Sequence, residues 1–79
     1  MKILFFANTR ELAGCSSIEW ETSVPMTEEA LWDWLGGRFP ALVPMKNLTR
    51  LARNGVWISR GELLHPGDEV AVLPPVSGG

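Results

Sequence analysis

The residues of this sequence best suited to chemistry are its last six, Pro74, Pro75, Val76, Ser77, Gly78 and Gly79. Glycine has no Cβ, so the final pair can pass through a tunnel that any other residue would block. The two prolines fix φ and favour an extended arm that points away from the fold. The carboxylate of Gly79 could be captured by a partner protein. It becomes an electrophile only after activation, for example as an anhydride with AMP, which a thiolate or persulfide can then attack.

Conventional catalytic side chains are scarce in the rest of the sequence. The one histidine, His65, stands in a turn, "HPGD", and no Ser or Cys nucleophile accompanies it by motif. The one cysteine, Cys15, has no basic neighbour that would activate its thiol, so we interpret it as a packing residue. The sequence has neither a spaced His/Cys set for a metal nor a glycine-rich phosphate loop. We therefore expect no side-chain active site, no metal and no cofactor bound by the domain itself.

Composition limits the class of protein. A chain of 79 residues predicts one domain, 1–79, with residues 74–79 as a protruding arm. The net charge is −2 and there is no run of basic residues, which argues against nucleic acid as a partner. The apolar stretch at the N-terminus is too short to be a signal peptide or a membrane span. A single cysteine fits a reducing compartment, so we expect a cytoplasmic protein.

Periodicity predicts the elements that must hold the arm. Residues 2–7 predict a buried strand, 8–14 a turn, and the alternation around 18–20 a second strand. Residues 27–35 predict a helix that Gly36 and Gly37 end. An irregular stretch, 38–49, follows, with one short helical turn between Pro40 and Pro44. Trp32 falls off the apolar stripe of that helix, so we expect its side chain to be exposed. Asn54-Gly55 predicts a hairpin, and residues 69–73 predict a last strand that the prolines stop.

The order β-β-α-β-β-β leaves one helix to cover one sheet. Because two strands precede the helix and three follow it, the strands must interleave in a single mixed sheet. The first and last strands are then neighbours and parallel. This arrangement predicts the α+β class and a β-grasp, or ubiquitin-like, fold with one main helix packed across the sheet.

Two stretches of the sequence resemble a known family. The opening "ILFFANTRELAG" and the closing "GDEVAVLPPVSGG" are similar to those of the small subunit of molybdopterin synthase, a ubiquitin-like sulfur carrier. The resemblance covers essentially the whole chain. A terminal Gly-Gly alone is a weak signal, but Gly-Asp-Glu-Val followed by Pro-Pro-Val-Ser-Gly-Gly at the end of a short chain is specific.

This resemblance implies a function in which the catalytic side chains belong to partners. An E1-like adenylating enzyme would activate Gly79 with ATP, and a desulfurase or rhodanese-type donor would supply sulfur to form a thiocarboxylate. Residues 74–77 would form the inserted arm, with Gly78 passing through the tunnel. In the large subunit of molybdopterin synthase, within a heterotetramer, the thiocarboxylate would donate sulfur to a cyclic pyranopterin precursor. We further expect a partner interface beside the last strand, formed by Val72, Leu73 and Trp57.

Three alternatives remain open on the sequence. The chain could carry sulfur for the thiazole of thiamine or for another pathway, although those carriers tend to be shorter and lack the Pro-Pro arm. It could be a ubiquitin-like modifier, because adenylation is the same first step. It could also be an interaction module whose tail is an inert, frayed terminus.

Overall fold

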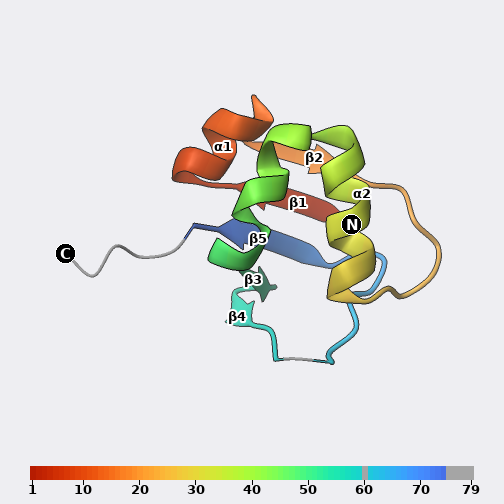
Figure 1. Ribbon diagram of the computed structural model, residues 1–79. Coiled ribbons are helices and arrows are strands. Elements are labelled where there is room, and N and C mark those ends of the chain that lie inside the picture. The colour runs from red at the N-terminus through yellow and green to blue at the C-terminus, as the bar shows by residue number, and fades with distance from the viewer. Residues whose placement is uncertain (60, 75–79) are drawn as a thin grey trace.

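The computed structural model describes residues 1–59 and 61–74. The elements in this part of the chain are β1 (Lys2–Phe5), α1 (Ala7–Ala13), β2 (Ser17–Glu19), α2 (Glu28–Arg38), the 3-10 helix η1 (Pro40–Leu48), β3 (Arg50–Arg53), β4 (Val56–Trp57) and β5 (Glu69–Leu73). Figure 1 shows α2 and η1 crossing in front of the sheet. None of the helices described is long and apolar enough to cross a membrane.

The five strands form one mixed sheet in the order β2-β1-β5-β3-β4. β1 pairs with β2 in antiparallel fashion and with β5 in parallel, with Ile3 opposite Val70. β3 pairs with both β5 and β4 in antiparallel fashion. The predicted β-grasp fold is confirmed, as is the parallel pairing of the first and last strands. The strand that leads into the arm is therefore the central one.

The core lies between the sheet and the helices. On one face of the sheet, alternate side chains are buried, because successive residues of a strand point to opposite faces. β1 and β5 contribute Ile3 and Val70, and α2 contributes Leu31 and Leu35, all with no exposed surface. Leu42 of η1 is equally buried. Each such side chain stabilises the fold by about 1.5–3 kcal/mol relative to its exposed state.

A helix replaces the turn predicted for residues 8–14. α1 begins directly after Phe6, with Ala7 at φ 49°, and ends at Gly14, whose φ of 78° is the left-handed conformation of a helix C-cap. The Gly14 N–H donates to the Arg10 carbonyl at 2.9 Å. Asn8 and Gly14 are typical turn residues, but they are also tolerated near the ends of a helix of about two turns.

The prediction that Gly36 and Gly37 end the helix is wrong. α2 continues through both to Arg38, and the Phe39 N–H still donates to the Leu35 carbonyl at 2.6 Å. Pro40 then begins η1, which continues to Leu48 and so is longer than the single helical turn expected between Pro40 and Pro44. Glycine lowers helix propensity by about 1 kcal/mol, a penalty that tertiary packing routinely overrides.

Two tryptophans are placed differently from the sequence expectation. Trp32 is only 5% exposed and belongs to the core, so the prediction that it is exposed is wrong. The cause is that α2 contacts η1 and also contributes to the buried cluster that the strands share, so a wider stripe of the helix is covered than one face. Trp57 on β4 is 48% exposed instead. The hairpin at Asn54-Gly55 is confirmed, with positive φ at both residues.

Candidate functional site

The base of the arm is the end of β5. β5 is paired on both sides, with Val72 opposite Phe5 of β1 and Leu73 opposite Arg50 of β3. Pro74, which follows directly, is half-buried. The other arm residues, Pro75, Val76, Ser77, Gly78 and Gly79, lie outside the described residues, so the roles expected for them stay predictions.

The face of the sheet opposite the helices carries a row of side chains that crosses every strand. The pairings place in one line Ser17, Leu4, Ala71, Ala52 and Trp57. These side chains share a face because the residues between them, such as Ile3 and Val72, are buried on the other one. Leu73 lies on the same face, two residues beyond Ala71 and next to the arm. We call Leu4, Ala71, Leu73, Ala52 and Trp57 the apolar row.

Arg50 holds Trp57 near the base of the arm. The Arg50 guanidinium carbon lies 4.3 Å from the centre of the Trp57 ring, a cation–π contact worth about 0.5–1 kcal/mol at an exposed site. Arg50 is also the residue opposite Leu73. The sequence pattern gave no signal for Arg50, because only the register of β3 against β5 brings it to this point.

The other end of the open face is charged. Glu19, Lys2 and Glu69 lie opposite one another on β2, β1 and β5, with a cation between two anions. The open face thus has the apolar row and Arg50 toward the arm and alternating charges at the end away from it.

One residue of the predicted interface is misplaced. Val72 has no exposed surface and packs in the core, so the prediction that it contacts a partner is wrong for its side chain. Its neighbour Leu73 is half-buried on the open face, and Trp57 is exposed there. Strand register decides which of two adjacent residues faces outward, and the sequence alone does not fix that register.

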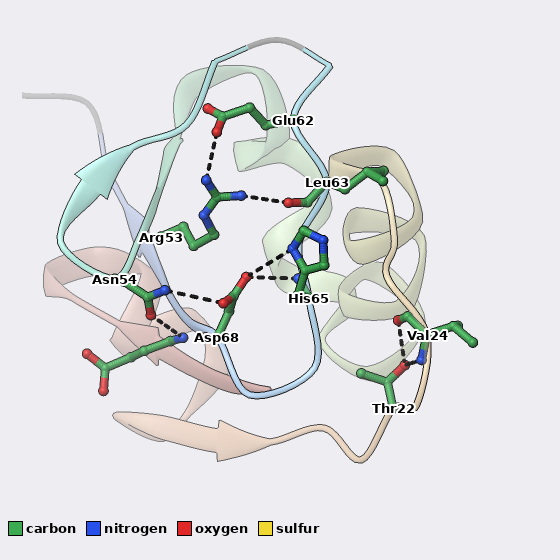
Figure 2. A network of polar contacts seen from close by, with 9 residues as sticks. Thr22, Val24, Arg53, Asn54, Glu62, Leu63, His65 and Asp68 are labelled. Carbon is green, nitrogen blue, oxygen red and sulfur yellow. Dashed lines mark hydrogen bonds and ion pairs between the residues drawn. The ribbon is translucent and has the colours of Figure 1, made fainter.

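The polar residues of the turn before β5 form a structural clip (Figure 2). The Arg53 guanidinium donates to Glu62 Oε1 and to the Leu63 carbonyl, each at 2.7 Å. Asp68 accepts from the Asn54 amide at 3.2 Å and from the His65 N–H at 2.8 Å. These contacts tie the β3–β4 hairpin to the chain that leads into β5.

The clip also perturbs two carboxylates. Partial burial of Asp68 acts to raise its pKa, but the hydrogen bonds from the His65 N–H and the Asn54 amide outweigh burial, so the net pKa is lowered. The pKa of Glu62 is lowered chiefly by a hydrogen bond from the Ser59 N–H. Both carboxylates are therefore ionised near neutral pH and serve as acceptors, which is a structural role.

The remaining candidates for conventional chemistry stay separate. Cys15 is a half-buried free thiol that packs against the core. Within residues 1–59 and 61–74, no three His, Cys, Asp or Glu side chains gather into a group that could hold a metal ion. A cleft of about 550 Å³ lies beside the start of α2, and Glu28, Glu29 and Glu62 are among the residues that line it.

Known proteins resemble this chain over its full length. The molybdopterin synthase sulfur carrier subunit of Homo sapiens is 38% identical over 85 residues, a match that covers 100% of this chain and 93% of that protein. The Arabidopsis thaliana protein of the same name is 32% identical and covers 100% of this chain and 82% of its own. Among solved structures, SAMP1 of Haloferax volcanii superimposes with a TM-score of 0.79 at 31% identity, covering 99% of this chain and 97% of that one.

The match to a family model is equally extensive. It runs from residue 3 to residue 79 and so includes both the β-grasp core and the arm. The chain therefore belongs to the ThiS family.

Proposed function

We propose that this chain is the sulfur carrier subunit of a molybdopterin synthase, and that the carboxylate of Gly79 carries the sulfur. The observation that supports this most directly is the position of the arm. It starts at the end of the central strand, β5. β5 is paired with β1 as far as Val72 and with β3 as far as Leu73. A rigid base followed by Pro74 and Pro75 suits an arm that must enter another protein.

The chemistry begins with activation in an E1-like adenylating enzyme. The Gly79 carboxylate attacks the α-phosphorus of ATP, which releases pyrophosphate and leaves an acyl adenylate. The terminal sulfur of a persulfide, held by a desulfurase or rhodanese-type donor, attacks the acyl carbon and AMP leaves. A thiol then cleaves the acyl disulfide and frees the thiocarboxylate. The domain binds no cofactor of its own in this scheme, and the steps belong to a reducing, cytoplasmic setting.

The large synthase subunit is the partner that receives the arm. Gly78 and Gly79 enter its active site, where the thiocarboxylate donates sulfur to a cyclic pyranopterin precursor. The apolar row, in which Leu73 is next to the arm and Trp57 is exposed on the edge strand β4, docks on that subunit. Aromatic residues such as Trp57 are enriched at the centre of interfaces because they bury much surface at little cost in side-chain entropy.

Intact mass measures the first half of the proposal. After incubation with ATP, the adenylating enzyme and a sulfur donor, the mass should rise by one sulfur in place of one oxygen. Deletion of Gly79 should abolish the change, and Cys15→Ser should leave it intact. A shift that Cys15→Ser removes would place the sulfur on the thiol and refute the assignment to Gly79.

Reconstitution measures the second half. The thiocarboxylated protein plus the large subunit should convert the precursor to molybdopterin. Thiazole formation in a thiamine assay, with no molybdopterin, would favour the thiamine carrier instead. If function is unchanged after deletion of Gly78 and Gly79, the carrier hypotheses are excluded and the chain acts as an interaction module.

One observation favours a second candidate, a ubiquitin-like modifier of proteins. A structure that superimposes on this chain with a TM-score of 0.78, at 28% identity, is the small archaeal modifier protein 1 of Haloferax volcanii. The same acyl adenylate could pass Gly79 to a lysine and form an isopeptide. Blots of cell extract with an antibody to this chain should then show conjugates of higher mass that deletion of Gly79 removes.

A further inference from the structure

The parallel ladder between β1 and β5 stops where the arm begins. The Lys2 N–H donates to the Asp68 carbonyl at 2.9 Å, and bonds of this kind recur at every second residue of a parallel strand. Four residues further on, the same pattern would join the Phe6 N–H to the Val72 carbonyl. β1 instead ends at Phe5, and Phe6 turns away into α1.

The hydroxyl of Thr9 stands in the place of that ladder bond. The Phe6 N–H donates to Thr9 Oγ1 at 3.0 Å, and the Thr9 hydroxyl in turn donates to the Val72 carbonyl at 3.0 Å. The hydroxyl therefore relays the bond from one strand to the other. The Phe6 carbonyl, 2.7 Å from Oγ1, is a second acceptor for the same hydroxyl proton. This carbonyl also accepts from the Thr9 N–H at 3.0 Å.

Proline makes this bond the last one on its side of β5. The next bond of the ladder would need an N–H at residue 74, and Pro74 has none. Beyond Val72, then, the ladder offers β5 no further donor toward β1. On the other side, β3 ends its pairing with β5 at Arg50 and Leu73.

Thr9 is also distinguished by its burial. It has no exposed surface, and among residues 1–59 and 61–74 it is the one polar residue in the buried class. A hydroxyl is costly to bury unless its hydrogen bonds are made, and here it satisfies groups of two elements at once. The base of the arm is thus fixed to α1 by a side chain 63 residues away in sequence.

We infer that Thr9 is a positioning residue that sets the direction in which the C-terminal arm leaves the fold. The inference rests on the proposed function, in which the arm must reach a reacting centre in the large subunit. Without the hydroxyl, the Val72 carbonyl loses its hydrogen bond from Thr9 of α1, while the pairing of β1 with β5 up to Phe5 and Val72 remains. The arm then starts from a looser base. The docking surface on the opposite face is unaffected, because Thr9 contributes nothing to it.

The experiment compares thiocarboxylated wild type, Thr9→Val and Thr9→Ser in the complex with saturating large subunit. Valine keeps the shape but removes the hydroxyl, so the single-turnover rate of sulfur transfer should fall about tenfold, since small misplacements of reacting groups are costly. The dissociation constant should stay within about twofold, because the interface is intact. Serine keeps the hydroxyl and should restore the rate.

A core variant separates positioning from mere loss of stability. Val70→Ala lies in the same strand, outside the arm and the open face, and lowers the melting temperature as Thr9→Val does, by roughly 5–15 °C. It should keep the wild-type rate of transfer once bound. Equal rates for Thr9→Val and wild type, or an equal loss in Val70→Ala, would overturn the inference.

Two further measurements cover the other outcomes. If Thr9→Val does not fold, Thr9→Ala, which also removes the hydroxyl, takes its place, and a wild-type rate for it overturns the inference. If wild type itself transfers no sulfur, the proposed function fails, and NMR then tests Thr9 alone. The heteronuclear NOE of the Leu73 and Val76 amides should drop in Thr9→Val and recover in Thr9→Ser; unchanged values would refute the positioning role.

Discussion

At the scale of single residues, the glycines and Ala7 show how position decides the effect of a residue type. Gly36 and Gly37 lie inside α2 and end nothing, whereas Gly78 and Gly79 belong to the arm. Ala7, by contrast, adopts the positive φ of 49° that glycine tolerates better. Gly36, Gly37 and Ala7 each depart from the usual preference of their residue type, and so each offers a substitution with a defined direction.

Substitution of the two helical glycines by alanine should stabilise the fold to different extents. A Cβ at Gly37 meets no heavy atom within 4 Å, so Gly37→Ala should raise the free energy of unfolding by about 0.5–1 kcal/mol. A Cβ at Gly36 would lie 3.1 Å from the Val43 side chain, so Gly36→Ala should gain less. Urea denaturation of both variants measures the difference, and a larger gain at Gly36 would contradict the packing described.

The positive φ of Ala7 predicts that glycine at this position should raise the free energy of unfolding. The left-handed conformation costs alanine about 1–2 kcal/mol, more than the roughly 0.5–1 kcal/mol of chain entropy that glycine adds. Ala7→Gly should therefore raise the free energy of unfolding by about 0.5–1 kcal/mol. Ala13→Gly, in the same helix, is the matched control and should lower it by a similar amount. A loss at Ala7 would show that its backbone is not strained in solution.

At the scale of elements, the clip around Asp68 connects the β3–β4 hairpin to the central strand. The Asn54 side chain accepts from the Glu69 N–H at 2.9 Å while its amide donates to Asp68 (Figure 2). The turn that reverses β3 thus also fixes the start of β5. β4 has only two residues, and a two-stranded hairpin on its own is marginally stable in water, so this anchoring matters for the edge of the sheet.

The clip predicts a loss of stability in acid. The pKa of Asp68 in the folded protein lies below its ordinary value of 3.8, so the charged form favours folding. Its contribution is complete above the unfolded pKa and is lost as the pH falls through the folded pKa, that is, below about pH 4. Melting temperatures measured from pH 6 down to pH 2.5 should show this fall.

A matched pair of variants assigns the acid effect to the clip. Asp68→Asn removes the titrating group, so its melting temperature should start lower at neutral pH and decline less in acid. Glu11→Gln, at an exposed position of α1 outside the clip, should follow the wild-type profile. An acid profile of Asp68→Asn that parallels wild type would mean that other carboxylates carry the effect.

At the scale of the whole molecule, one side of the sheet supplies stability and the other supplies a surface. Trp32 and Trp57 illustrate this division, being 5% and 48% exposed. The helices cover the first face (Figure 1), and they leave the apolar row on the other face uncovered. Two substitutions of one residue type can therefore separate folding from binding.

Trp57→Ala should weaken binding to the large subunit by about 2 kcal/mol, roughly thirtyfold, with little change in melting temperature. Trp32→Ala should instead cost about 3–5 kcal/mol of stability, a large share of what a domain of this size has. Calorimetric titration and thermal melts measure the two effects. Unchanged affinity in Trp57→Ala would remove the apolar row from the docking surface.

The sequence by itself determined the fold class, the last strand at 69–73 and the hairpin at Asn54-Gly55, and it predicts the arm as the place where chemistry belongs. These predictions rest on local conformational preferences and on a motif, both of which depend on residues that are close together in the sequence. The helix at 7–13, the continuation of α2 through Gly36 and Gly37, and the burial of Trp32 and Val72 were decided by tertiary structure. Each depends on which surface a second element covers. Thr9 and Arg50 reach the base of the arm only because β1, β3 and β5 pair in one register, and contacts between distant residues leave no periodic signal in a single sequence.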